Sequence, residues 1–464
     1  MYRNTFIRIL CIISFLFGSI VLSAKPAYRF SLQIEGNTDS VMYLGYYLGQ
    51  HRYLCDSAKA SRPGRFRFEG SRTLPPGMYF FSNREGRLVE FVIYHEQPDF
   101  KFRTDEANWR RNMTVSGSKE NAILCNFRRE MDSYYDVLEA QKDVLDSSAF
   151  EQLRRQQYQK VDTLRMRTIE RYPDAMVSRM MLASRPPLPP PDSLQGNDRY
   201  FYLVHHYFDN MPLDDDFIVR TPPEVFYDRI AEYTDRYMKG LTPELAIPLL
   251  DTLIDRSEPA PEVFKWLVHT LTEKYLQSTV MVYDEIYVHL VNRYYASGKA
   301  FWADPSWLDK ELERAARWER LLVGREAPEL ILFDTLHVPH SLHRMPGKYT
   351  LLVFWSPTCG HCREVIPAIY KVFEQIAEEK DITAFAILSE PDDATVVKWK
   401  HFIDEFHMHS PRWVHLNGAE ANVDWREVYD ITSTPQIYLI DNANHRFIAK
   451  KLNADLFERI CKQL

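Results

Sequence analysis

The sequence lacks the features that mark nucleic-acid-binding and multi-span membrane proteins. Its 464 residues include 57 Lys and Arg against 64 Asp and Glu, which gives a formal net charge of −7. No long run of like charge is present, so no electrostatic surface for nucleic acid is indicated. After residue 22, no apolar stretch approaches the roughly 20 residues that a spanning helix needs.

The N-terminus has the layout of a secretory signal peptide. Arg3 and Arg8 precede the apolar run Ile9–Leu22, and the small residues Ser23 and Ala24 follow it. An uncleaved anchor is the alternative, although the run is short for a spanning helix, which needs about 20 residues. We expect residues 1–24 to be a signal peptide that directs export to the periplasm or cell envelope, with no spanning segment after cleavage.

Cysteine is scarce, with 6 residues in the chain, one of them inside the apolar run. An exported chain meets an oxidising compartment, where thiols tend to pair. Cys55, Cys125 and Cys461 are far apart in sequence, so we expect isolated buried thiols, with a Cys55–Cys125 bridge left open. Only Cys359 and Cys362 have an informative spacing.

The hydrophobic patterns predict a multidomain protein, consistent with roughly 150 residues per domain. Short alternating segments separated by Gly, Pro, Asn and Asp predict an all-β, sandwich-like domain over residues 25–118. Apolar residues at three- and four-residue spacing predict an all-α domain over 119–322, in which the proline-rich residues 186–191 form an extended linker. Residues 323–464 alternate strand and helix, which predicts a C-terminal α/β domain.

The element order of this last region is that of the thioredoxin fold, βαβ followed by ββα. Its first strand, Tyr349–Trp355, is a continuous apolar run, which is typical of a buried central strand. A hairpin around residues 329–342 is an added element. The other predicted elements are a helix over 360–378, a strand over 382–388, a helix over 393–406, a strand over 413–416, a turn around 425–429, strands over 436–440 and 446–450, and a helix from 454.

The motif Cys359-Gly360-His361-Cys362 leaves a predicted strand and opens a predicted helix. The partial positive charge of a helix N-terminus stabilises a thiolate, so we expect the pKa of Cys359 to be lowered. Cys359 would then attack a protein disulfide, and Cys362 would resolve the mixed disulfide. A protonated His361 would stabilise the thiolate further and make the couple more oxidising, near the isomerase range of roughly −180 mV.

Other readings of two nearby cysteines fit less well. A c-type haem site needs His directly after the second cysteine, where this chain has Arg363, and a zinc site needs four ligands, whereas no second C-x-x-C exists. A peroxiredoxin would need proline at the position of Leu352. We therefore expect redox chemistry with no metal and no cofactor.

Thr434-Pro435, directly before a predicted strand, is the second candidate feature. In the thioredoxin fold a proline here is cis and faces the cysteines, and the backbone of Thr434 pairs with an extended substrate. The alternative is a proline that only begins a strand. We also predict that Trp355, at the end of the strand before the motif, helps to position the substrate.

These motifs together resemble those of the extracytoplasmic thiol-disulfide oxidoreductases of the TlpA/ResA type. The resemblance implies protein thiols and disulfides as substrates and a separate, unidentified partner that recycles the motif. The whole chain also resembles a longer class in Gram-negative gut bacteria, in which β and helical domains precede the thioredoxin-like domain. The matching segments of the C-terminal region are residues 324–328, 354–362, 367 and 434–441.

Two positions depart from the family pattern. Val353 stands where thioredoxins carry a buried Asp, and Val365 stands where ResA-like proteins often carry Glu. Glu364 and Glu390 are candidate replacements, so the proton acceptor of Cys362 is left open. The alternative to an enzyme is an envelope binding or adaptor protein with a non-catalytic thioredoxin-like scaffold, which the size of the first 320 residues motivates.

Overall fold

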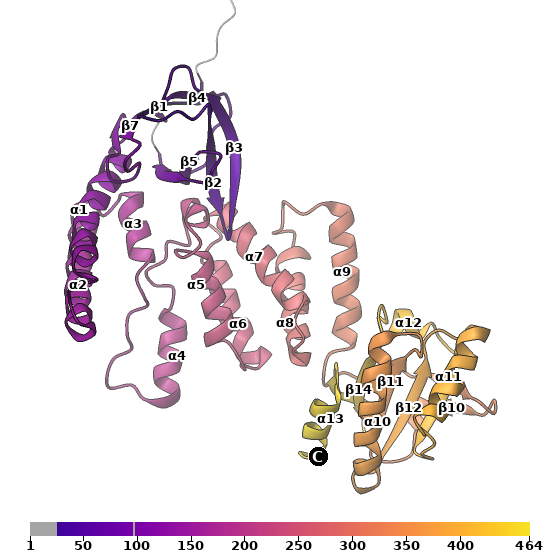
Figure 1. Cartoon of the computed structure of the whole chain (residues 1–464). Coiled ribbons are helices and arrows are strands. Elements are labelled where there is room, and N and C mark those ends of the chain that lie inside the picture. Colours follow the sequence, from indigo (N-terminus) through magenta and orange to yellow (C-terminus); the bar gives the residue numbers. More distant parts are fainter. Residues whose placement is uncertain (1–25, 96–97) are drawn as a thin grey trace, which may run out of the picture. The chain divides into compact units, whose positions relative to one another are not determined.

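The computed structural model describes residues 26–95 and 98–464, so the predicted signal peptide lies outside the described residues. Along the chain, a β-sheet region, a helical middle and a C-terminal sheet region follow one another, as predicted (Figure 1). Contacts divide the chain into two compact units. Unit 1 contains residues up to Arg185 together with Arg220–Phe226, and unit 2 contains Pro186–Val219 and Tyr227–Leu464. The three predicted domain boundaries stay predictions.

Unit 1 holds two four-stranded sheets within its described residues, in the orders β4-β1-β7-β8 and β3-β2-β5-β6. Their inner side chains share one core, in which the Phe81 ring lies 6.2 Å from Phe30 and 5.3 Å from Phe68. Aromatic rings therefore join the two sheets. The strands are β1 (Tyr28–Glu35), β2 (Val41–Leu48), β3 (His51–Lys59), β4 (Arg65–Gly70), β5 (Gly77–Ser82), β6 (Leu88–Ile93), β7 (Asp99–Asp105) and β8 (Thr114–Ser116).

The edge strand β3 was not predicted from the sequence. Its first five residues are all exposed, so no alternation of buried and exposed positions reveals it. Cys55 lies in this exposed part, and the expectation that it is buried is therefore wrong. Cys125 is half-buried on the first helix, and both thiols are free, so no Cys55–Cys125 bridge is formed in this structure.

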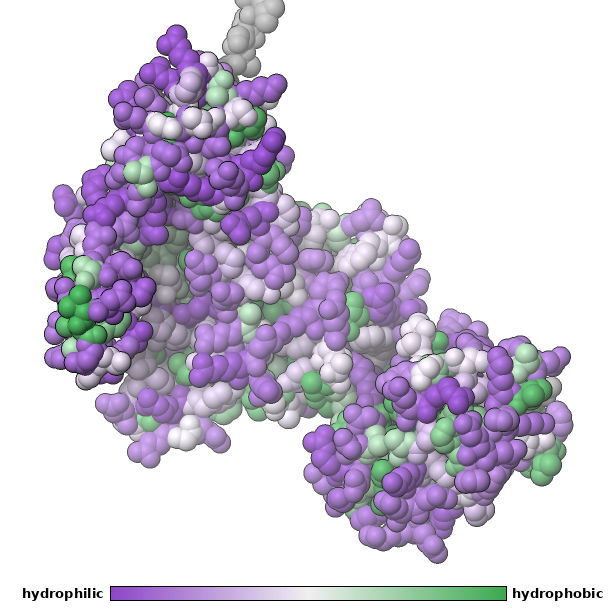
Figure 2. Space-filling model, in the orientation of Figure 1, coloured by the Kyte–Doolittle hydropathy of each residue, from purple (hydrophilic) through white to green (hydrophobic). Residues whose placement is uncertain are grey.

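Three helices, α1 (Lys119–Gln141), α2 (Ser147–Arg171) and α3 (Met176–Ala183), belong to unit 1. The Asn121 side chain bonds both the N–H and the carbonyl of Val92 on β6, at 2.8 and 2.7 Å. These bonds attach α1 to the sheet. Figure 2 shows a largely hydrophilic surface with an apolar patch on the α1–α2 hairpin, whose exposed residues include Val137 and Val144.

A short segment separates two helices of unit 2. Helix α7 ends at Leu276 and α8 begins at Asp284. Ser278, Thr279 and Val280 are weak helix formers and separate the two. The helices are α4 (Gly196–His206), α5 (Tyr227–Glu232), α6 (Pro243–Asp255), α7 (Pro261–Leu276), α8 (Asp284–Leu290) and α9 (Pro305–Arg320), with π turns at Tyr233–Tyr237 and Val291–Tyr295.

The C-terminal region is a seven-stranded mixed sheet in the order β10-β9-β13-β12-β11-β14-β15. Strands β11, β12 and β13 are parallel, and β14 is antiparallel to β11. The strands are β9 (Ile331–Asp334), β10 (Pro339–Ser341), β11 (Tyr349–Trp355), β12 (Ile382–Leu388), β13 (Trp413–Ala421), β14 (Gln436–Asp441) and β15 (Arg446–Lys450). The helices are α10 (Gly360–Lys380), α11 (Asp393–Glu405), α12 (Trp425–Val428) and α13 (Ala454–Cys461).

Strand β11 is buried on both faces, as predicted. Leu351, Val353 and Trp355 enter the core cluster that α10, α11 and α13 cover. Leu352 and Phe354 enter a second cluster on the opposite face. This double burial explains the continuous apolar run, because neither face of the strand meets water.

Charged side chains join the C-terminal sheet to the helices of unit 2. Asp284, which is 1% exposed, pairs with Lys450 at 2.6 Å and with Lys451 at 2.7 Å. Asp430 accepts hydrogen bonds from Arg317 and from the Trp318 indole, at 2.8 and 2.7 Å. These carboxylates are compensated on several sides, as buried charges require.

Candidate active site

The sequence motif begins where β11 ends, and Cys359 caps the N-terminus of α10. Its backbone is extended, and its sulfur accepts a hydrogen bond from the Cys362 N–H at 3.3 Å. The first N–H groups of a helix have no partner inside the helix, so they are free to bind the cap side chain. The predicted position of Cys359 at a helix start is confirmed.

The surroundings of the Cys359 sulfur favour a thiolate. Burial raises the pKa of this thiol, but hydrogen bonds to the sulfur lower the pKa by more. These bonds involve the Cys362 thiol and N–H, the Thr434 side chain and the His361 N–H. The pKa of Cys359 therefore lies below its ordinary value of 9.0. His361 acts here through its backbone, and its side chain is exposed. The contribution of a protonated imidazole stays a prediction.

Cys362 has the opposite environment. It is 0% exposed and lies in the same core cluster as Val353 and Ile366. Burial raises its pKa to about 12, and the neighbouring Cys359 sulfur raises it as well. One thiol of the motif is thus half-buried with a lowered pKa, whereas the other is fully buried with a raised pKa.

The Thr434–Pro435 peptide bond is cis, as predicted. The Cys359 thiol donates a hydrogen bond to the Thr434 carbonyl at 3.3 Å, so the fold brings together two segments 75 residues apart. A thiolate has no proton to donate, so ionisation of Cys359 releases this carbonyl. A free carbonyl beside the sulfur can accept a hydrogen bond from an extended peptide.

Trp355 does not reach this surface. Its side chain is 0% exposed, and its ring packs 4.9 Å from that of Phe402. The prediction that Trp355 positions a substrate by contact is wrong, because strand alternation turns it to the same core face as Val353.

Glu390 is the residue of this site whose role the sequence did not reveal. Both Ser356 and Thr358 donate a hydroxyl hydrogen bond to its Oε2 atom, at 2.7 and 2.6 Å. These bonds lower the pKa of Glu390. The carboxylate therefore holds the loop that leads into Cys359.

Neither candidate replacement for the missing base contacts Cys362. Within the described residues, no hydrogen bond joins Glu364 or Glu390 to the Cys362 sulfur, and Glu364 is exposed. Val353 and Val365 both pack in or against the apolar cluster around Cys362. The side chains that pack around this thiol are thus largely apolar, and its polar contacts are with Ser356, Thr434 and Cys359.

Two further observations concern the described part of the chain. Across residues 26–95 and 98–464, no group of three or more His, Cys, Asp or Glu is arranged to hold a metal ion. No helix in these ranges is long and apolar enough to cross a membrane.

Two family models match parts of the chain. One is a domain of unknown function (DUF4369) over residues 28–124, and the other is a domain of unknown function (DUF5106) over residues 184–315. The first covers the two sheets of unit 1 and the start of α1, and the second covers most helices of unit 2.

Relatives with known names are thioredoxin-like. The chain is 27% identical over 118 residues to the thioredoxin-like protein YneN of Bacillus subtilis, which is 25% of this chain and 65% of that protein. It is 24% identical over 123 residues to the thiol-disulfide oxidoreductase ResA of Bacillus thuringiensis subsp. konkukian, covering 26% and 66% of the two chains. The matches thus span just under two thirds of these relatives.

A solved structure extends the likeness. A crystal structure of a thioredoxin-like protein from Bacteroides caccae matches with a TM-score of 0.50 at 20% identity, over 60% of this chain and 98% of that one. At this identity the likeness concerns the fold. The comparisons together support a relationship to thioredoxin-like thiol-disulfide oxidoreductases.

Proposed function

We propose that this protein is an extracytoplasmic thiol-disulfide oxidoreductase of the TlpA/ResA type, with residues 323–464 as its thioredoxin-like domain. The observation that carries the proposal is the contrast between the two thiols. Cys359 has a lowered pKa at a helix start, whereas Cys362, one turn later, is buried with a pKa of about 12. This division suits one nucleophilic and one resolving cysteine.

The reaction balances as a two-electron exchange. The Cys359 thiolate attacks one sulfur of a substrate disulfide, forms a mixed disulfide and expels the other sulfur as a thiolate. The Cys362 sulfur loses its proton and attacks Cys359, which releases the second substrate thiolate and leaves a Cys359–Cys362 disulfide. The substrate is reduced and the motif oxidised; run backwards, the same steps oxidise a dithiol. A redox partner, not yet identified, restores the starting form.

Formation of the mixed disulfide itself favours the second step. The Cys359 sulfur is one cause of the raised pKa of Cys362, through its charge and its hydrogen bond. A mixed disulfide removes that charge, so the pKa of Cys362 falls at the stage when its thiolate is needed. Burial, the largest cause, stays in place, so we expect resolution to be slower than attack.

The Thr434 carbonyl and Pro435 are proposed to position an extended substrate segment beside Cys359, and His361 to tune the potential of the couple. Residues 25–118 and 119–322 are proposed as separate β and helical domains.

The proposed export of the protein rests on the N-terminal sequence pattern. Cell fractionation tests it: the full chain should appear in the envelope or periplasm, and recovery in the cytoplasm would refute the location.

Insulin reduction tests the activity. Cys359→Ser should abolish turnover, Cys362→Ser should form an adduct without turnover, and Cys125→Ser, a free thiol on α1, should keep the parental rate. Parental activity in Cys359→Ser would overturn the proposal. The relatives named as oxidoreductases do not favour the adaptor alternative.

A further inference from the structure

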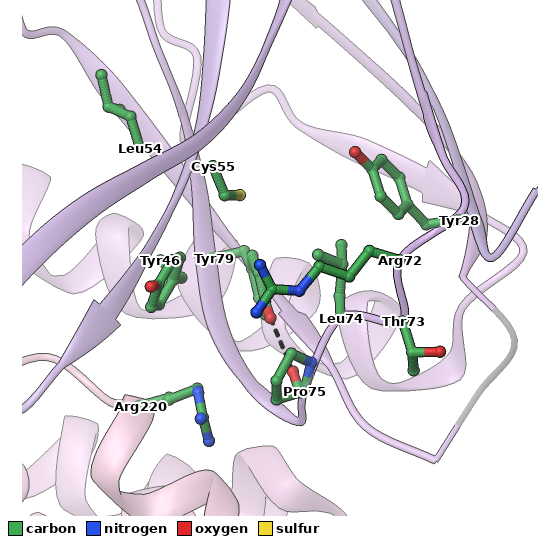
Figure 3. A pocket seen from close by; sticks show the side chains of 10 residues that line it. All are labelled: Tyr28, Tyr46, Leu54, Cys55, Arg72, Thr73, Leu74, Pro75, Tyr79 and Arg220. Carbon is green, nitrogen blue, oxygen red and sulfur yellow. Dashed lines mark hydrogen bonds between the residues drawn. The ribbon is translucent and has the colours of Figure 1, made fainter. Parts of the chain in front are cut away.

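Unit 1 contains a pocket of about 360 Å³, outside the cysteine motif. This volume lies within the roughly 300–1,000 Å³ that is typical of small-molecule sites. Figure 3 shows its lining from β1, β2, β3 and β5, from the loop before β5, and from the segment 220–226 that folds with this unit. The lining residues are Tyr28, Tyr46, Leu54, Cys55, Arg72, Thr73, Leu74, Pro75, Tyr79 and Arg220.

Fixed aromatic rings form the walls. Tyr28 donates its hydroxyl to Asp56 at 2.6 Å, and Tyr79 donates its hydroxyl to the Pro75 carbonyl at 2.8 Å. The Tyr46 ring lies 6.0 Å from that of Tyr79. Since two hydroxyls are already used within the protein, these rings offer mainly their apolar faces to a ligand.

The charged residues that line the pocket are all positive. Arg72 and Arg220 are its charged residues, and it includes no Asp or Glu. Although the Cys55 residue as a whole is exposed, partial desolvation of its sulfur beside the pocket raises the pKa of the thiol to about 11, and the charge of Asp56 adds to this, so the thiol is neutral at pH 7. The carboxylate of Asp56, next to Cys55 in the chain, already accepts a hydrogen bond from Tyr28. The lining therefore favours an anion.

Arg72 is the group placed to bind that anion. Figure 3 shows its side chain extending across the pocket, with the guanidinium close to Tyr79 and Cys55. Arg72 is exposed, and its guanidinium makes no hydrogen bond or ion pair within the described part of the chain. A guanidinium presents a planar set of donors that matches a carboxylate.

Arg220, which lines the pocket, packs closely against the first residue of β5. A Cβ at Gly77 would lie 2.4 Å from the Cβ of Arg220, a distance too short for two carbon atoms. Glycine at this position therefore lets the buried Arg220 pack against β5. The second cation is thus held in place by the fold.

We propose that this pocket binds a small carboxylate with an aromatic body, its carboxylate on Arg72 and its ring against the pocket-facing sides of the Tyr46 and Tyr79 rings, which pack on each other. Leu54 and Leu74 complete the apolar wall. The site is independent of the redox proposal, because none of the motif residues lines it.

Calorimetric titration of the full chain with 3-phenylpropionate tests the proposal, and 3-phenylpropanamide serves as the uncharged isostere. We expect saturable one-to-one binding of the acid, with the amide at least tenfold weaker. Arg72→Gln should weaken the acid at least tenfold, whereas Arg84→Gln, an exposed arginine outside the pocket lining, should leave it unchanged.

Alkylation gives a second readout, because Cys55 lines the pocket. Bound acid should slow maleimide labelling of Cys55, as located by peptide mass spectrometry, and should leave labelling of Cys359 unchanged. Equal binding of acid and amide, parental affinity in Arg72→Gln, or no binding of the acid at millimolar concentration would overturn the proposal. The acid–amide comparison uses the parental chain and does not depend on the folding of a variant.

Discussion

The different environments of Cys359 and Cys362 predict a large difference in alkylation rate. A thiol with a pKa of about 12, as in Cys362, is ionised in roughly one molecule in ten thousand at pH 8. A thiol of ordinary pKa 9.0 is ionised in about one in ten, and the lowered pKa of Cys359 makes its fraction larger still. Ionisation alone therefore favours Cys359 by roughly a thousandfold or more.

Variants that keep only one cysteine of the motif allow the two alkylation rates to be measured separately. Cys362→Ser reports Cys359 alone and Cys359→Ser reports Cys362 alone, each with iodoacetamide between pH 5 and 10 and with peptide mass spectrometry. The Cys359 rate should reach its half-maximum below pH 9. In Cys359→Ser the pKa of Cys362 should fall, because the Cys359 sulfur contributes to raising it. The pKa should still stay above 9, because burial is the largest cause of its increase and is unchanged in the variant.

The control is the same reaction in denaturant, where both thiols should react at similar rates. Equal rates for Cys359 and Cys362 in the native protein at pH 8 would refute the reasoning, since they would show that neither the helix start nor the core sets the two pKa values.

Three further predictions concern stability. Asp284→Asn leaves Lys450 without its buried counter-charge and should lower the free energy of unfolding, measured in urea, by about 3–5 kcal/mol. The control Asp235→Asn, at an exposed ion pair, should lower it by less than about 1 kcal/mol. Equal losses in the two variants would contradict the prediction. Phe81→Ala empties the centre of the unit 1 core and should cost about 3–5 kcal/mol, so a loss below about 1 kcal/mol would show that the rings repack. Burial lowers the pKa of His415 to about 4, so acid titration between pH 6.5 and 4 should lower stability by up to about 1.4 kcal/mol per pH unit, and His415→Gln should flatten that slope.

The sequence predicted best where both faces of an element are buried. The strands Tyr349–Trp355 and Ile382–Leu388 agree with the structure at both ends, because each apolar run gives way to a polar residue, Ser356 or Ser389, where the strand ends. The strand His51–Lys59 could not be found in this way, since its exposed edge carries no alternating pattern. The helix Pro305–Arg320 lies within the region predicted to be helical, and Asp304 and Pro305 give it a start signal.

Contacts between residues far apart in the sequence could not be predicted from local patterns. The Asn121–Val92 bonds, which place α1 with the sheets, join residues 29 apart. The hydrogen bond from Ser356 to Glu390 spans 34 residues, so no local pattern predicts it. The incorrect prediction for Trp355 could have been avoided from the sequence. Trp355 is two residues after Val353 on the same strand, so the two side chains share a face, which is the core face.

Trapping of the mixed disulfide tests the central claim most directly. Purified Cys362→Ala is mixed with a disulfide-containing protein, and the adduct is mapped by non-reducing peptide mass spectrometry. The account predicts a single adduct on Cys359 that the parental chain resolves. No adduct, or an adduct distributed over Cys55, Cys125 and Cys461, would contradict it.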